Sequence, residues 1–141
     1  MDYEPVEQLT EAHLADLHRL YAGEWWCKDR TLDETLRVVA GSSMVFGFTA
    51  SGTLVAFARV LTDRIFKALV FDVIVDPAHR GAGLGDLLMR RILDHPDLRD
   101  VRTIELYCLP DLVPFYERFG FTTDLGGVLF LRRSIQRASR E

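Results

Sequence analysis

The spacing of apolar residues along the chain switches between a helical period and a strand period. Apolar positions recur every three or four residues in four stretches, which predicts helices over residues 10–21, 32–39, 83–93 and 111–119. Shorter apolar or alternating runs, bounded by turn signals, predict strands over residues 3–9, 44–50, 54–61, 68–75 and 101–108. Residues 121–125 and 128–131 flank Gly126-Gly127, and they predict a closing hairpin.

Local signals mark where the first two helices begin and end. Thr31 followed by Glu34 fits a capping box, and Gly41 is expected to end the helix that they start. Thr10 is followed by His13, which is not the acidic or amide residue of a capping box. We therefore expect Thr10 to cap the first helix alone.

The strand over residues 68–75 is the most apolar one, and only Asp72 interrupts it. A run this apolar predicts a central strand buried on both faces, and Pro77 is expected to end it because proline cannot donate to the ladder. The helix that follows is expected to bury one face, made of Leu84, Leu87, Leu88 and Ile92. This order of elements predicts a mixed α/β sandwich, in which one sheet carries helices on its faces.

Length, composition and charge narrow the function classes. A chain of 141 residues suits one domain over residues 1–141, and 48% hydrophobic with 27% charged residues is an ordinary globular balance. The net charge is −4, and no nucleic-acid partner is predicted. The basic residues that come closest together lie in the C-terminal tail, which is expected to be a solvated end: Arg132, Arg133, Arg137 and Arg140. The two cysteines and four histidines show no spacing typical of a disulfide framework or a metal site. Without a signal peptide or a bilayer-length apolar run, the expected location is the cytoplasm, with no membrane partner.

The strongest chemical signal is the glycine-rich turn between the apolar strand and the helix over residues 83–93. A helix start leaves its first N–H groups unpaired, and glycines remove the Cβ atoms that would keep a bulky anion away from them. Together these features predict a phosphate cradle. A P-loop is excluded because Leu84-Gly85 stands where lysine and serine or threonine belong, and the spacing of Gly81, Gly83 and Gly85 does not fit the Rossmann fingerprint.

The turn reads Arg80-x-x-Gly83-x-Gly85, and residues 114–121 read PFYERFGF. Both segments resemble the signatures of the GNAT superfamily of acetyl-CoA-dependent N-acetyltransferases. The resemblance covers the whole order of elements, although only about a third of the chain carries specific motifs. It implies a mostly antiparallel central sheet flanked by helices. It also implies that the fourth and fifth strands splay apart, here over residues 71–75 and 104–108.

The same resemblance implies a binding site for acetyl-CoA. The backbone amides of the glycine-rich turn would hold the pyrophosphate, and Val73 and Val75 would pair with the pantetheine arm and the acetyl carbonyl, as an added strand does. The residues implied in cofactor binding are Val73, Val75, Arg80, Gly81, Ala82, Gly83, Leu84, Gly85 and Asp86.

Acetyl transfer requires a neutral amine and a proton for the departing thiolate. By resemblance Tyr116 is the candidate acid, and a phenol, whose ordinary pKa is about 10, is protonated at neutral pH. The alternative is that Tyr116 is only a packing aromatic. Phe115, Phe119 and Phe121 are expected to be better core residues. Asp72 is the candidate base or amine anchor. A carboxylate in a buried strand is unfavourable unless it is paired, so Asp72 is expected to be functional or hydrogen-bonded for structural reasons. Glu105 is a weaker candidate, for which a solvated strand face is the alternative.

Two adjacent tryptophans, Trp25 and Trp26, are candidates for the acceptor site, which the family places near the loop between the first two helices. Aromatic walls suit an aryl group or a cation, whereas core packing is the alternative for both residues.

The function predicted from the sequence is an N-acetyltransferase. It would transfer the acetyl group of acetyl-CoA, without a metal, to a primary amine of a small molecule or peptide by direct attack in a ternary complex. The alternative is a non-catalytic acyl-CoA-binding sensor or interaction module. Tyr116 favours the enzyme, because a pure binder needs no acid there. The sequence leaves open the acceptor amine and whether the protein is a monomer or a homodimer.

Overall fold

The structure is a computed structural model that describes residues 2–135. The chain forms two compact units, Met1–Tyr107 and Cys108–Glu141. Arg137 and Arg140 of the predicted basic tail lie outside the described residues. Within residues 2–135, no helix has the length and apolar character needed to cross a membrane.

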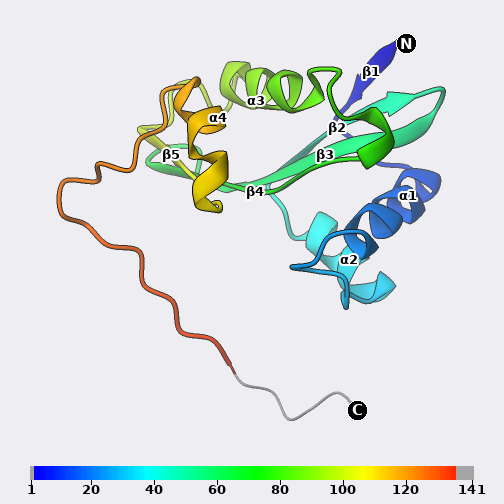
Figure 1. Cartoon of the computed structure of the whole chain (residues 1–141), viewed down its shortest axis with the longest axis horizontal. Helices are drawn as coiled ribbons and strands as arrows, with labels where there is room; N and C mark the ends of the chain where they lie inside the picture. Colours follow the sequence, from blue (N-terminus) through cyan, green and yellow to red (C-terminus); the bar gives the residue numbers. More distant parts are fainter. Residues whose placement is uncertain (1, 136–141) are drawn as a thin grey trace. The chain divides into compact units, whose positions relative to one another are not determined.

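The first unit is built on one five-stranded sheet (Figure 1). Its strands follow one another in space as they do along the chain: β1 (Tyr3–Val6), β2 (Met44–Ala50), β3 (Thr53–Thr62), β4 (Lys67–Val75) and β5 (Thr103–Glu105). The first four strands pair antiparallel, and β5 pairs parallel to β4. This is the mostly antiparallel sheet that the sequence predicted, although β5 is much shorter than the expected run over residues 101–108.

Three helices cover the two faces of this sheet (Figure 1). The helices α1 (Glu11–Ala22) and α2 (Leu32–Ala40) lie on one side, and α3 (Leu84–Asp94) lies on the other. Beneath α1 a core cluster of buried side chains fills the space to the sheet: Leu17, Leu20, Tyr21, Cys27, Val45, Leu54, Phe57 and Ile74. The mixed α/β sandwich predicted from the sequence is therefore confirmed.

The helices α1 and α2 both begin with a capping box, in which the cap residue and the third helical residue bond to each other. Thr31 and Glu34 form the predicted capping box, with hydrogen bonds of 3.1 and 2.9 Å. The prediction that Thr10 caps alone is wrong, because the Thr10 amide also donates to the ring Nδ1 of His13 at 3.2 Å. A histidine nitrogen can accept in the same way as a carboxylate, so it completes the box.

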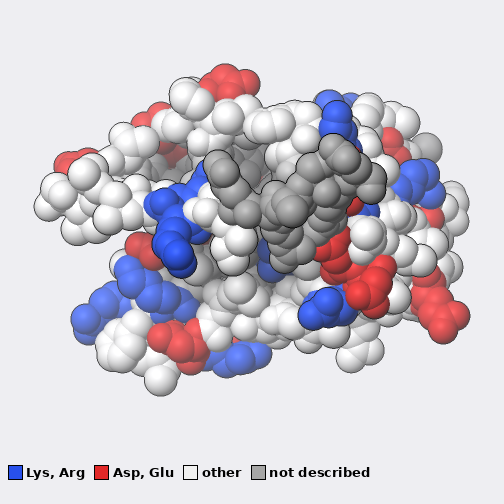
Figure 2. All heavy atoms as spheres, turned by 90° about the horizontal axis from the view of Figure 1, so that it is seen from below, with Lys and Arg blue, Asp and Glu red and all other residues white. Residues whose placement is uncertain are grey.

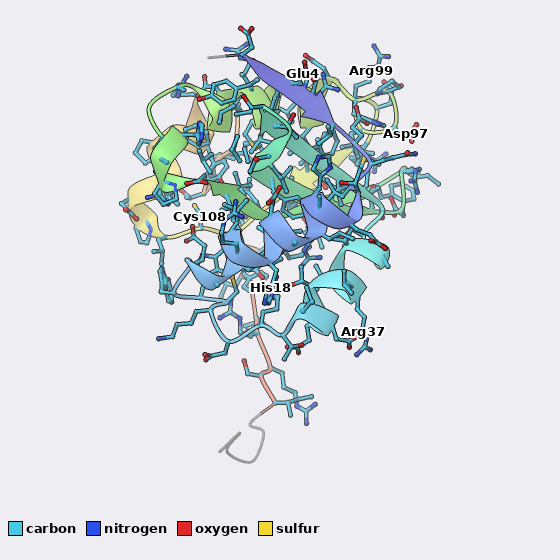
Figure 3. The ribbon with its side chains drawn as sticks, turned by 90° about the vertical axis from the view of Figure 1, so that its right-hand side faces the viewer. Glu4, His18, Arg37, Asp97, Arg99 and Cys108 are labelled. Carbon is cyan, nitrogen blue, oxygen red and sulfur yellow. The ribbon has the colours of Figure 1, made fainter. Side chains whose placement is uncertain are left out.

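The two helices are also tied to each other through a buried threonine. His18 of α1 points toward α2 (Figure 3), and its Nδ1 lies 3.0 Å from the hydroxyl of Thr35. Thr35 has no exposed surface. A satisfied polar pair therefore fixes the packing of α1 on α2.

Two predictions about burial are wrong. The strand β3, not β4, is buried on both faces, because residues 54–58 are all buried whereas β4 buries only Ala68, Val70 and Ile74. In α3 the exposed fraction of Leu87 is 39%, and Met89 takes its place in the buried face. The pairing of β4 with β5 ends at Leu69, so within the described residues the final part of β4 lacks a partner strand on one side.

The second unit contains the short helices η2 (Pro110–Leu112) and α4 (Val113–Glu117). The predicted hairpin over residues 121–131 is wrong. The Gly126-Gly127 turn does form, and the Val128 amide donates to the Leu125 carbonyl at 3.2 Å. Within the described part of this unit, however, no strand flanks the turn. An isolated two-stranded hairpin is marginal in water without a surface to pack on, so the turn signal alone does not produce strands.

Gly47 in the middle of β2 provides a test of the sheet packing. A Cβ on this residue would lie 2.7 Å from Leu54 Cδ1 and 3.2 Å from the backbone oxygen of Ala56. We expect Gly47→Val to lower the free energy of unfolding by roughly 1–3 kcal/mol, because overpacking displaces neighbouring groups. The control Gly23→Ala, whose Cβ would meet its nearest atom at 3.5 Å, should change it little. Urea unfolding of both variants measures this, and an unchanged midpoint for Gly47→Val would contradict it.

Candidate functional site

Asp72 interrupts strand β4 with a backbone conformation that side chains rarely adopt. Its φ is 56°, in the left-handed region. At this point the pairing with β3 shifts register, so that Phe57 faces Ile74 but Arg59 faces Phe71. This is a β-bulge, which bends a strand and redirects its side chains.

The carboxylate of Asp72 is the centre of a partly buried cluster, which we call the Asp72 cluster: Tyr21, Arg30, Arg59 and Asp72. Its Oδ2 accepts hydrogen bonds from the Tyr21 hydroxyl at 2.8 Å, from Arg30 Nη1 at 3.3 Å and from Arg59 Nε at 2.7 Å. Only 7% of the Asp72 side chain is exposed. The expectation that this carboxylate is hydrogen-bonded is confirmed, whereas its role as base or amine anchor stays a prediction.

The environment fixes the protonation of the groups around that carboxylate. Burial, together with the nearby Asp72 charge, raises the pKa of Tyr21 far above its ordinary value. Burial lowers the pKa of Arg30, but the charge and hydrogen bond of Asp72, together with smaller effects of Tyr21 and Cys27, outweigh burial and raise that pKa overall. Burial also raises the pKa of Cys27 to about 11, so this thiol stays protonated at neutral pH. Tyr21 therefore acts as a donor and Arg30 as a cation at neutral pH.

Strand β4 has an open edge on the side that faces β5. The parallel pairing joins only residues 67–69 to residues 103–105 and ends at Leu69 opposite Glu105. Beyond that point, within the described residues, Val73 and Val75 have no ladder partner on this side. The strands therefore part where the family resemblance implied. Glu105 forms an exposed ion pair with Lys67 Nζ at 2.9 Å, as expected of a solvated strand face.

The glycine-rich turn opens directly after β4 and the 3₁₀ turn η1 (Pro77–His79). Gly81 and Gly83 both have positive φ, at 83° and 81°, so the turn needs glycine at these positions. A Cβ on either residue would have no heavy atom within 4 Å. No side chain among residues 2–135 caps the start of α3 at Gly83. The helix N-terminus thus faces open space, as an anion cradle requires.

The other residues predicted around the turn have distinct surroundings. Arg80 donates from Nε to the Val75 carbonyl at 3.3 Å, and its Nη2 lies 3.6 Å from Glu24. Leu84 is buried, so only its backbone is available to a ligand. The first helical turn comprises Leu84, Gly85 and Asp86, and Ala82 lies in the exposed turn before it. The structure thus brings the predicted cradle residues together at one helix start.

A cavity of about 220 Å³ lies between the end of α1 and the segment before the glycine-rich turn. It is lined by Arg19, Leu20, Gly23, Glu24, Ile74, Asp76 and Pro77. Sequence reasoning missed this cavity and its two carboxylates, Glu24 and Asp76. Glu24 follows α1 in a loop without a motif, and only the fold brings it beside the turn.

The two tryptophans are placed differently. Trp26 packs its ring edge-to-face on Tyr21 at 6.4 Å, and the Arg30 guanidinium lies 6.0 Å from the Trp26 ring. Trp25 is 69% exposed. The structure therefore joins Trp26 to the Asp72 cluster and leaves Trp25 on the surface, so core packing does not explain Trp25.

Tyr116 lies in α4 of the second unit and is the one buried residue of that helix. Its ring contacts Phe115 and Phe121 edge-to-face at 4.9 and 6.0 Å. The expectation that the neighbouring phenylalanines are the better core residues is wrong, because all three are more exposed than Tyr116. Burial, with a smaller effect of Cys108, raises the pKa of Tyr116 to about 12. The hydroxyl is therefore protonated at neutral pH, as a proton donor must be.

The chain matches a known protein family over most of its length. The model of the Acetyltransferase (GNAT) family matches residues 7–121. The chain belongs to this family. A GNAT-family protein from Xanthomonas campestris pv. campestris has a similar crystal structure, with a TM-score of 0.86 and 32% identity, and the match covers 96% of this chain and 94% of that one.

Two curated relatives add detail to this GNAT assignment. The uncharacterized N-acetyltransferase ycf52 of Gracilaria tenuistipitata var. liui is 33% identical over 120 residues, which cover 82% of this chain and 65% of the relative. Serotonin N-acetyltransferase 2, chloroplastic, of Oryza sativa subsp. japonica is 39% identical over 87 residues, or 60% of this chain and 44% of the relative. The match to this GNAT chain thus spans about two thirds of the first relative and less than half of the second.

The GNAT family generally uses acetyl-CoA as donor, and the cradle of this chain fits its pyrophosphate, because Gly81 and Gly83 leave the helix start open. The residues that would hold it are those of the turn and of the open edge of β4. Within residues 2–135 no group of three or more histidine, cysteine, aspartate or glutamate side chains could hold a metal ion. On the face shown in Figure 2, basic and acidic side chains are interspersed.

Gly83 is the most direct test of the cradle. We expect Gly83→Val to weaken acetyl-CoA binding by roughly tenfold or more, equivalent to at least about 1.4 kcal/mol, because the side chain would occupy the open space at the helix start. The matched control is Gly52→Val in the turn between β2 and β3, where φ is 83° and a Cβ also meets nothing within 4 Å. It carries the same backbone strain and should keep its affinity. Equal calorimetric affinities for two folded variants would rule out the cradle.

Proposed function

We propose that the protein is an enzyme that transfers the acetyl group of acetyl-CoA to a primary amine of a small molecule or peptide, by direct attack in a ternary complex. The observation that carries this proposal is the continuity of the open edge of β4 with the uncapped start of α3. Backbone groups along such an edge can bind an extended pantetheine arm as they would bind a strand. The helix start then binds the pyrophosphate. We keep the cytoplasm as the predicted location.

The amine would approach the face of the sheet that carries α1 and α2. There the Asp72 carboxylate uses Oδ2 for its three hydrogen bonds, and Oδ1 has none to the described residues. We assign Oδ1 the role of anchor or proton acceptor for the amine. An alkylamine has a pKa of about 10.4 in water, so a proton must leave it before attack. Trp25 and Trp26 are proposed to border this approach.

The departing thiolate requires a proton, and Tyr116 is the proposed donor. Its raised pKa keeps the hydroxyl protonated throughout the physiological range, and the acid form is lost only as the pH rises through about 12. The Tyr116 hydroxyl can therefore donate its proton to the thiolate without first having to be protonated. This assignment rests on the resemblance of residues 114–121 to the family signature.

The proposal is tested by acetyl-CoA-dependent thiol release over a panel of amines. Release of free thiol that depends on the amine, together with the acetylated amine as product, is the expected result. A protein that binds acetyl-CoA but acetylates none of the amines would favour the alternative, a non-catalytic acyl-CoA sensor. The binding step is measured separately by calorimetry.

Tyr116→Phe deletes only the proposed proton donor. We expect kcat to fall by roughly 10²–10⁴-fold, with a small change in KM for acetyl-CoA, because the ring remains. In the wild type, no fall in rate from deprotonation of Tyr116 is expected until the pH approaches its pKa of about 12. Phe115→Leu, which alters the neighbouring ring but no hydroxyl, serves as the control. Wild-type kcat in a folded Tyr116→Phe protein would remove Tyr116 from the mechanism.

Asp72→Asn tests the proposed proton acceptor. Without a base, only amine that is already neutral in solution can react, so turnover should fall more at low pH than at high pH. Glu105→Gln removes an exposed carboxylate from the next strand and should leave the pH profile unchanged. The measurement is kcat/KM against pH for the three proteins. A parallel loss at every pH would show that Asp72 is a structural group.

A further inference from the structure

The Asp72 cluster contains more positive than negative charge. Two guanidinium groups, those of Arg30 and Arg59, contact one carboxylate, and both donate to the same oxygen. Neither arginine makes another ion pair within residues 2–135. One arginine would be enough to neutralise Asp72, so the cluster carries one cation in excess.

The excess charge is partly buried and has donors to spare. The exposed fractions of the Arg30 and Arg59 side chains are 20% and 16%. Arg59 uses Nε for Asp72, and its two terminal nitrogens make no hydrogen bond to the described residues. An arginine offers five N–H donors, and a partly desolvated charge without a full set of partners is unfavourable. The cluster therefore has both a positive charge and N–H donors available for a further anion.

The faces of both guanidinium groups are covered by aromatic rings. Arg59 lies 4.8 Å from the centre of the Phe71 ring, and Arg30 lies 4.2 Å from the centre of the Tyr21 ring. Stacking of this kind fixes the plane of a guanidinium and leaves its edge to hydrogen-bond. A planar edge with parallel N–H donors binds carboxylate or phosphate in two-point fashion.

The geometry points to an acceptor amine that carries its own anionic group, a carboxylate or a phosphate, a few bonds from the nitrogen. Arg59, assisted by Arg30, would bind the anionic group while Asp72 Oδ1 holds the amine. The two positions are close because Arg59 Nε and Asp72 Oδ2 are 2.7 Å apart. This inference rests on the proposed function, and it makes Arg59 a residue that determines specificity.

The experiment compares two matched pairs of amines, β-alanine with β-alaninamide and phosphoethanolamine with ethanolamine. The two members of each pair differ in the anionic group. For each amine, kcat/KM is measured with the wild type, with Arg59→Met and with Arg37→Met. Arg59→Met leaves Tyr21 and Arg30 on Asp72. Arg37 on α2, labelled in Figure 3, is an exposed arginine whose removal changes the net charge by the same amount.

We expect the wild type to prefer the anionic member of at least one pair. Arg59→Met should reduce kcat/KM for that member by roughly ten- to a hundredfold, mostly through KM, as for loss of charge-assisted hydrogen bonds. The neutral member should lose clearly less than the anionic member, because for both amines the variant removes one of the three donors that hold Asp72. Arg37→Met should affect neither member. The pair that shows the preference distinguishes carboxylate from phosphate. The inference is overturned if the wild type has the same kcat/KM for both members of each pair, or if Arg59→Met lowers kcat/KM equally for both. Either result leaves the acetyltransferase proposal intact.

A binding measurement separates this inference from the proposed function. Calorimetry in the presence of CoA compares N-acetyl-β-alanine with N-acetyl-β-alaninamide, and N-acetylphosphoethanolamine with N-acetylethanolamine. Tighter binding of an anionic product that Arg59→Met abolishes supports the inference even if no amine is turned over. If no amine is turned over, equal binding within both pairs overturns it. If Arg59→Met does not fold, as judged by circular dichroism, Arg30→Met takes its place.

Discussion

A carboxylate held at a left-handed position in strand β4 is the constraint on which the site depends. A residue other than glycine at a φ of 56° is strained by roughly 1–3 kcal/mol, and it persists only where its surroundings compensate. Here three donors converge on one oxygen of Asp72 and hold it there. The bulge that results is the point where β4 changes its register with β3. The bulge thus fixes how the last residues of the strand meet the glycine-rich turn.

The same interaction joins three parts of the first unit. Tyr21 comes from the end of α1, Arg30 from the loop before α2 and Arg59 from β3. Because Arg30 bonds to Asp72, the loop that carries Trp26 and Glu24 is fixed against the sheet. The loop in turn contributes to the wall of the cavity beside the turn. The Arg30–Asp72 ion pair therefore links two regions. One is the side of the sheet on which the amine is proposed to bind, and the other is the end of β4 that leads to the glycine-rich turn.

The features that could be predicted from the sequence are those with local causes. Gly81 and Gly83 adopt positive φ, and Thr31 with Glu34 forms its capping box, because each depends on a few neighbouring residues. The predictions that were wrong rest on sequence patterns that are compatible with more than one structure. The apolar run of β4 fitted a strand buried on both faces, yet only Ala68, Val70 and Ile74 of this strand are buried. The turn at Gly126 fitted a hairpin, but strands also need a surface to pack on.

The sequence by itself determined the open helix start, since the glycines of the turn set its backbone and need no distant partner. It also identified Asp72 as a residue that required an explanation, because an ionised group in an apolar strand is unfavourable without partners. Only the tertiary structure decided what those partners are. Tyr21 and Arg30 lie 51 and 42 positions from Asp72 in the chain. No periodicity or spacing relates residues so far apart, because their contact depends on how α1 and its following loop pack across the sheet.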